Sequence, residues 1–122
     1  MFSKTRFPLR AREDIIVYKE FRMKDKLFLC TPVRGIKVPD QKEWPFVMIP
    51  DCRPPLRFSK EAAYIKGEGY IHAFTYKVQR YNYLYPEIRL VECIIPKGTK
   101  YHLSKSGKEI CARKLILMRI IK

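Results

Sequence analysis

The clearest fold signal in this chain is EIRLVECII (87–95), which ends at the turn sequence PKG (96–98). Aliphatic and β-branched residues dominate this stretch and the later segment KLILMRII (114–121), and such residues favour strands. Between the two, YHL (101–103) is a shorter strand candidate, and SKSG (104–107) has the composition of a tight turn. The last third of the chain therefore predicts a strand, a hairpin and a further strand.

Segments nearer the N-terminus also have strand composition, and their limits are 15–21 (IIVYKEF), 27–33 (LFLCTPV), 44–49 (WPFVMI) and 70–76 (YIHAFTY). The third is a short edge strand inside a proline-rich, loop-like region over residues 39–58, because proline removes ladder donors. Alternation in the fourth places four ring-bearing side chains on one face, namely Tyr70, His72, Phe74 and Tyr76.

Helical signals in the chain are short. The segment SKEAAY (59–64) is the best helix candidate, since Ser59 can cap it and Glu61 with two alanines favours a helix. The whole pattern predicts an α+β fold, a small and mostly antiparallel or mixed β-sheet with one or two short helices. We expect one domain over residues 13–122, preceded by a basic flexible arm over residues 1–12.

Net charge is the strongest compositional signal. The chain has 26 Lys and Arg residues against 12 Asp and Glu residues, a formal net charge of +14. Both ends are basic, since residues 1–12 hold no acid and Glu109 is the only acid between Lys97 and Lys122. Such an excess attracts polyanions, so the expected partner is nucleic acid or an acidic protein surface, and the oligomeric state stays open.

Cysteine usage and hydropathy indicate a protein of the reducing cytosol. The four cysteines are Cys30, Cys52, Cys93 and Cys111; none forms a CxxC pair, so we expect reduced, buried thiols and neither a metal site nor a cofactor. Disulfides are the alternative. The N-terminus has no continuous apolar signal-peptide core, and no stretch approaches the ~18 apolar residues of a membrane span.

Candidate binding residues fall into three groups. His72 titrates near neutral pH and, with Arg34, could line a ligand pocket; alternatively it is a half-buried histidine bonded to backbone. Tyrosines alternate with cations after the strand 70–76, a pattern that suits stacking of unpaired bases together with phosphate contacts. Alternatively, the tyrosines cover an edge of the core. The residues of this second group are Lys77, Arg80, Tyr81, Tyr83, Tyr85 and Arg89. The third group is Lys97 and Lys100, which flank Gly98 in a turn that lacks the spacing of a P-loop. The alternative is that this segment is a turn with no binding role.

No catalytic set can be assembled from spacing. The sequence shows no Ser-His-Asp or Cys-His arrangement and no obvious carboxylate pair, so the residues favour a binding protein over an enzyme.

Two stretches resemble a known family. GYIHAFT and VECIIPKGTKYHLSKSGKEICARKLILMRI are similar to small proteins of Bacteroides-type gut bacteria and their phages. The matching residues are Gly69, His72, Ala73, Phe74, Cys93, Ile94, Ile95, Pro96, Lys97, Gly98, Thr99 and Tyr101. This resemblance implies a phage association and the cytoplasm of a bacterial host, and it points to no particular activity. A looser similarity to ADP-ribosyltransferase-like folds implies nucleotide or nucleic-acid binding, although the STS-type strand and ExE loop of the active enzymes are missing here.

Three functional hypotheses follow. The first is a small, basic, non-enzymatic accessory protein, possibly phage-encoded, which acts on nucleic acid or an acidic protein, for example by inhibiting a host nucleic-acid enzyme. The second is a nucleotide-handling enzyme or a degenerate ADP-ribosyltransferase-like relative that uses His72 and Arg34. The third is a structural component of a phage assembly, in which the basic arm meets packaged DNA.

Overall fold

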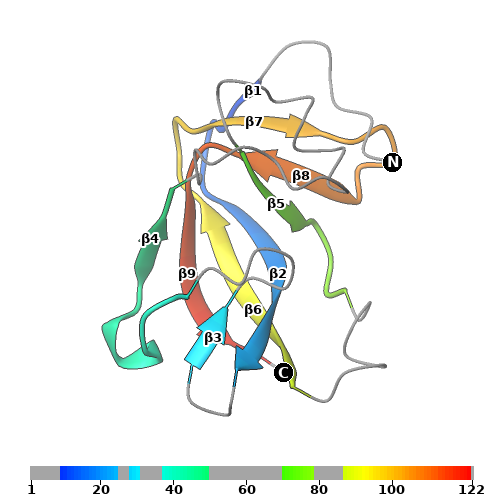
Figure 1. Cartoon of the computed structure of the whole chain (residues 1–122). Coiled ribbons are helices and arrows are strands. Elements are labelled where there is room, and N and C mark those ends of the chain that lie inside the picture. The colour runs from blue at the N-terminus through cyan, green and yellow to red at the C-terminus, as the bar shows by residue number, and fades with distance from the viewer. Residues whose placement is uncertain (1–8, 25–27, 31–36, 50–69, 79–86, 122) are drawn as a thin grey trace.

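The computed structural model describes residues 9–24, 28–30, 37–49, 70–78 and 87–121, and its order of elements is shown in Figure 1. Within these residues, the strands are β1 Leu9–Arg10, β2 Ile15–Lys24, β3 Phe28–Cys30, β4 Phe46–Met48, β5 Ile71–Phe74, β6 Ile88–Ile95, β7 Lys100–Leu103, β8 Glu109–Ala112 and β9 Leu115–Ile120. The 3-10 turn η1 Gln41–Glu43 is capped by Asp40, whose Oδ1 accepts a hydrogen bond from the Lys42 N–H (3.0 Å).

The described strands form one antiparallel sheet in the order β1-β7-β8-β5-β2-β6-β9-β4, with β3 paired to β2. Every strand pair in this sheet is antiparallel. Each strand predicted above has a counterpart here, and the short edge strand expected in the proline-rich region is β4 at one end of the sheet.

The predicted α+β class is wrong, because the described part of the chain is almost entirely antiparallel β-structure and η1 is its only helical turn. The helix expected over 59–64 lies outside the described residues. That prediction used the composition of six residues, and so short a helix is marginal without packing partners. The two-residue periodicity of the rest of the chain is the signal that the structure follows.

Short connections curl the sheet. β6 and β7 are joined by Pro96–Thr99, yet β2, β5 and β8 separate them in the sheet. Arg113 and Lys114 likewise join β8 to β9, although β5, β2 and β6 lie between them in the sheet. The half containing β1, β7 and β8 therefore turns over and runs across the half containing β2, β6 and β9, as Figure 1 shows. Such crossing is the orthogonal form of sheet packing.

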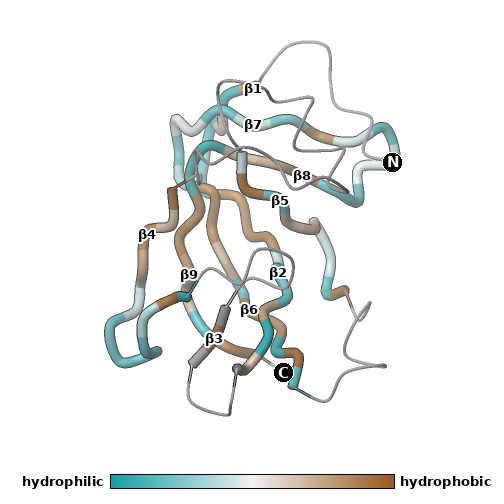
Figure 2. Tube along the Cα trace, viewed as in Figure 1, coloured by the Kyte–Doolittle hydropathy of each residue, from teal (hydrophilic) through white to brown (hydrophobic). Residues whose placement is uncertain are grey.

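The main core lies between the two halves. Alternate residues of the long strands point into it and are fully buried, including Val17, Phe21, Cys93, Leu115 and Leu117. Hydrophobic residues concentrate along the middle of β2, β6 and β9, whereas the turn between β7 and β8 is hydrophilic (Figure 2). The side chains of Cys93 and Cys111 are buried, as predicted, while those of Cys30 and Cys52 lie outside the description.

Two strands have no predicted counterpart with defined bounds. β8 is the second strand of the expected hairpin, and β1 falls within the arm predicted over residues 1–12. Leu9 and Arg10 pair with Tyr101 and Lys100 of β7, so this part of the arm segment belongs to the sheet, and residues 1–8 lie outside the description. In the described part of the chain, no helix has the length and hydropathy needed to cross a membrane.

Candidate functional site

Cations from adjacent strands line up at the end of the molecule formed by β1 and β7. Arg10 of β1 and Lys100 of β7 are register partners, and both side chains are exposed. Their neighbours Ala11 and Thr99 are buried, because alternate residues of a strand point to opposite faces. The register therefore directs Arg10 and Lys100 to the same outward face.

This line of cations continues across β8 to β5. The Arg113 N–H donates to the Lys100 carbonyl oxygen (3.1 Å), which extends the β7–β8 register by one residue beyond Tyr101 and Ala112. The Arg113 guanidinium in turn lies 5.7 Å from the ring centroid of Tyr70, directly before β5. We call Arg10, Lys100 and Arg113 the cation row; the Tyr70 ring ends it.

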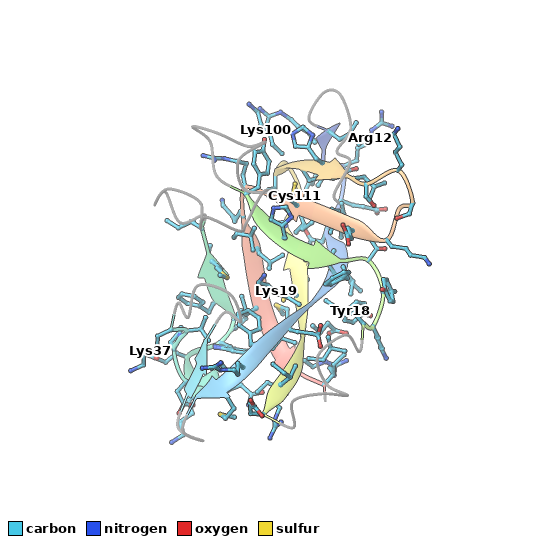
Figure 3. All side chains as sticks on the ribbon, turned by 45° about the vertical axis from the view of Figure 1, so that its right-hand side comes forward. Arg12, Tyr18, Lys19, Lys37, Lys100 and Cys111 are labelled. Atoms are coloured by element: carbon cyan, nitrogen blue, oxygen red, sulfur yellow. The ribbon has the colours of Figure 1, made fainter. Side chains whose placement is uncertain are left out.

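A glycine turn holds the cation row at its outer end. Gly98 has φ +90°, a left-handed conformation that glycine adopts freely. Its N–H donates to the Ala11 carbonyl (2.8 Å), and its own carbonyl accepts from Arg10 Nη1 (2.9 Å). Two more exposed cations, Arg12 and Lys97, flank this turn, and Figure 3 shows Arg12 and Lys100 at the same end of the molecule.

One carboxylate lies at this end, because Asp14 Oδ1 accepts a hydrogen bond from the Lys97 backbone N–H (2.9 Å). Within the described residues, none of Arg10, Arg12, Lys97 and Lys100 forms an ion pair with a carboxylate. Elsewhere the structure does contain such a pair, between Arg119 Nε and Glu92 Oε2 (3.0 Å). Adjacent strands are about 4.8 Å apart, so the aligned cations raise the local positive potential over a short distance.

A row of histidines and a cysteine lies next to the cation row. His72 of β5 and His102 of β7 are both register partners of Cys111 in β8, between them. Cys111 and His102 are buried, and the Tyr70 ring packs on Cys111 and meets the His102 ring edge-on at 5.2 Å. No group of three or more metal-ligating side chains with metal-binding geometry occurs in the described residues.

One lysine points toward the core. Lys19 of β2 lies on the side of Val17 and Phe21, and its Nζ donates to the His72 carbonyl oxygen (2.8 Å). Burial lowers the pKa of Lys19, because a low-dielectric surrounding disfavours the cation. Burial also raises the pKa of the nearby Cys93 thiol to about 12. A protonated thiol is a poor nucleophile, so Cys93 acts as a core residue.

The structure separates the predicted site residues. Lys97 and Lys100 lie together beside Arg10, and His72 is one row further into the same sheet half. Lys77 is exposed beyond β5, and Arg89 lies on β6, where its Nη1 donates to the Ile88 carbonyl (3.1 Å). The remaining predicted residues lie outside the described part of the chain: Arg34, Arg80, Tyr81, Tyr83 and Tyr85.

Sequence reasoning missed Arg10, Arg113 and Tyr70 as members of a site. A turn fixes the register of a hairpin, but the turn predicted over 104–107 would pair Leu103 with Lys108. The structure instead pairs Ser104 with Glu109 and Leu103 with Ile110, and this register brings Arg113 beside Lys100. Arg10 could not be placed from a turn either, because its pairing with β7 joins residues far apart in the sequence.

Comparisons of this chain with protein-family models, with curated proteins and with solved structures find no match. The similarities to the Bacteroides-type family and to ADP-ribosyltransferase-like folds therefore stay predictions.

Proposed function

We propose that this protein binds nucleic acid, with the cation row contacting phosphates and the Tyr70 ring contacting a base. The observation that carries the proposal is the alignment of Arg10, Lys100 and Arg113 on three neighbouring strands beside an aromatic ring. Cations aligned with an aromatic side chain are the combination that single-stranded nucleic acids require.

The form of the site favours nucleic acid over an acidic protein surface. Phosphates recur at regular intervals along a strand, and a linear set of cations can contact several of them at once. The Tyr70 ring adds a contact that a carboxylate cannot use, since a stacked base contributes about 1–3 kcal/mol in such complexes. An acidic protein offers carboxylates at irregular positions, which match a linear set of cations less well.

Salt dependence of binding to a fluorescent single-stranded oligonucleotide tests the proposal. We expect the affinity of the unmodified protein to fall steeply with salt, because phosphate contacts release counterions. The double variant Arg10→Gln, Lys100→Gln should weaken binding and lower the slope of log K against log salt by about 0.7 for each lost contact. The matched control is Lys42→Gln, Lys105→Gln, which removes the same charge from exposed residues of η1 and the β7–β8 turn.

Equal losses of affinity and slope in the two double variants would show that net charge alone attracts the oligonucleotide, and would overturn the proposed site. A second arm replaces the oligonucleotide with polyglutamate of similar charge. Binding of polyglutamate as strong as that of the oligonucleotide would favour an acidic protein partner. Tyr70→Leu should reduce affinity for the oligonucleotide and leave the salt slope unchanged, because stacking involves no counterion.

A further inference from the structure

A row of aliphatic side chains crosses the outer face of the other sheet half. The register pairs Ile16 of β2 with Ile94 of β6, Ile94 with Ile116 of β9, and Ile116 with Val47 of β4. Ile16 is 56% exposed and Val47 49% exposed, while Ile94 and Ile116 are partly exposed. We call these four residues the aliphatic row.

The aliphatic row does not belong to the core. The neighbours of its members along the strands point the opposite way and are buried, namely Val17, Cys93, Leu117 and Met48. The row is therefore a second apolar surface on the outside of a sheet whose inside is already packed. Contiguous exposed apolar surface of this kind marks an interaction site on a small protein.

The charges around the aliphatic row are balanced, unlike those of the whole chain. Glu92 and Arg119, which form an ion pair, lie beside it on β6 and β9. Asp14 and Lys114 lie two residues before Ile16 and Ile116. Among the described residues, two acids and two cations thus flank the row, in a protein with a net charge of +14. The described part of this face therefore has no excess positive charge with which to recruit an acidic partner.

We infer that the aliphatic row packs against a second copy of this chain. Copies with a charge of +14 repel one another over most of their surface, and a neutral apolar face is where that repulsion is least. A two-fold axis parallel to the strands between β6 and β9 places Ile94 over Ile116 of the second copy. The same axis places Glu92 over Arg119 of the second copy, so the face is complementary to itself, as a two-fold interface requires.

Packing of face on face is also favoured over pairing of edges. β4 ends the sheet, but Pro45 lies directly before it and has no N–H to donate to a new strand. The inference does not depend on nucleic-acid binding, since the aliphatic row shares no residue with the cation row.

Sedimentation equilibrium of the nuclease-treated full chain at several concentrations tests this inference. We expect a monomer–dimer equilibrium that persists when salt is raised from about 0.1 M to about 1 M, because apolar burial is not screened. Ile16→Asp should raise the dimer dissociation constant about 100-fold or more, since it places a carboxylate in the interface of each copy. Leu9→Asp is the control, because Leu9 is also exposed (43%) but lies on β1 outside the row.

Charge reversal provides a second test that does not rely on the aliphatic residues. Glu92→Arg and Arg119→Glu should each be monomeric alone and should form a mixed dimer when combined, because their faces then carry opposite charges. Circular dichroism checks that each variant is folded. A wild-type protein that stays monomeric at all concentrations, or an Ile16→Asp variant that dimerises like the Leu9→Asp control, would overturn the inference. Failure of the charge-reversed pair to associate would overturn the proposed two-fold arrangement.

Discussion

Replacing Lys19 with methionine tests how the interior of the fold accommodates a cation. Lys19 lies partly buried on the core-facing side of β2, and its Nζ donates to the His72 carbonyl oxygen (2.8 Å). The same Nζ is 5.8 Å from the centroid of the Phe21 ring. Figure 3 shows Lys19 toward the middle of the molecule, away from the end that carries Arg12 and Lys100. Methionine has a similar length and keeps the packing while removing the charge.

Two opposing contributions decide the effect near neutral pH. Withdrawing a cation from water has an effective cost of several kcal/mol in proteins, which Lys19→Met removes. The substitution also removes a charge-assisted hydrogen bond of about 1.5–3 kcal/mol and a cation–π contact of about 1 kcal/mol. Since these contributions nearly cancel, we expect the unfolding free energy to change by less than about 2 kcal/mol.

The pH dependence discriminates more sharply than the value at one pH. Burial lowers the folded-state pKa of Lys19 below its ordinary value of 10.5. Between these two pKa values the unfolded chain binds more protons, so the stability of the wild-type protein rises with pH by at most about 1.4 kcal/mol per pH unit. Below the folded-state pKa, Lys19 is charged in both states, and the wild-type protein bears the full free-energy cost of burying the ammonium. The stability of Lys19→Met relative to wild type should therefore be greatest at the lower pH and fall as pH rises.

Cys93 changes the stability of both proteins in the opposite direction. Its pKa is raised from 9.0 to about 12, so the stability it contributes is present below pH 9.0 and is lost as pH rises toward 12. The Lys19 ammonium lowers the Cys93 pKa, so Lys19→Met raises that pKa further. Up to about pH 10 the thiol stays protonated in both folded proteins, and its effect therefore cancels in their difference over that range.

Urea unfolding of both proteins from about pH 6 to about pH 10 measures that difference. Lys42→Met on η1 is the control, because the Lys42 side chain is exposed, and its difference from wild type should not vary with pH. A difference for Lys19→Met that stays constant over the whole range, or that grows with pH, would refute the placement of the Lys19 ammonium in the interior.

Two further substitutions test the backbone and the two faces of the sheet. Gly98→Ala should lower the unfolding free energy by about 1–2 kcal/mol, because the left-handed φ of +90° is strained for alanine. A Cβ at this position would meet no atom within 4 Å, so the backbone conformation alone causes the loss. Urea unfolding that is unchanged by the substitution would contradict the conformation of this turn. Leu117→Ala should lower the unfolding free energy by about 2–5 kcal/mol, since Leu117 is fully buried. Ile116→Ala, on the opposite face of β9, should lower it by less than half as much in dilute solution. Equal losses of stability in thermal melts would contradict the assigned faces of β9.

The strands could be predicted where the hydrophobic pattern was long. Residues 87–95 and 114–121 contain enough aliphatic residues that their identity as β6 and β9 does not depend on the rest of the fold. β8 was harder to place, since Glu109–Ala112 provides only four residues and includes a glutamate and a cysteine. The α+β class was wrong because one short helix-like segment was given more weight than the strand composition of the rest of the chain.

The candidate site was predictable only in part, because it is a product of long-range pairing. Lys97 and Lys100 were identified as candidates because they are two cations on either side of a glycine turn. The contribution of Arg10 depends on the β1–β7 pairing, which residues 1–12 do not encode by any local pattern. Lys19 shows the same limit, since the alternation of IIVYKEF puts it on the side of Val17 without revealing that this side faces the core.

The curl of the sheet explains how one small domain can present two different surfaces. Arg113 and Lys114 join β8 to β9, so the chain passes within a few residues from the cation row to the aliphatic row. Because the two sheet halves cross, their outer faces point in different directions, and one face can pack against a second copy while the other stays open. A dimer built on the aliphatic row would then carry two cation rows. For binding to a long single-stranded oligonucleotide, the slope of log K against log salt should be steeper for this dimer than for the Ile16→Asp variant, because two cation rows release more counterions than one.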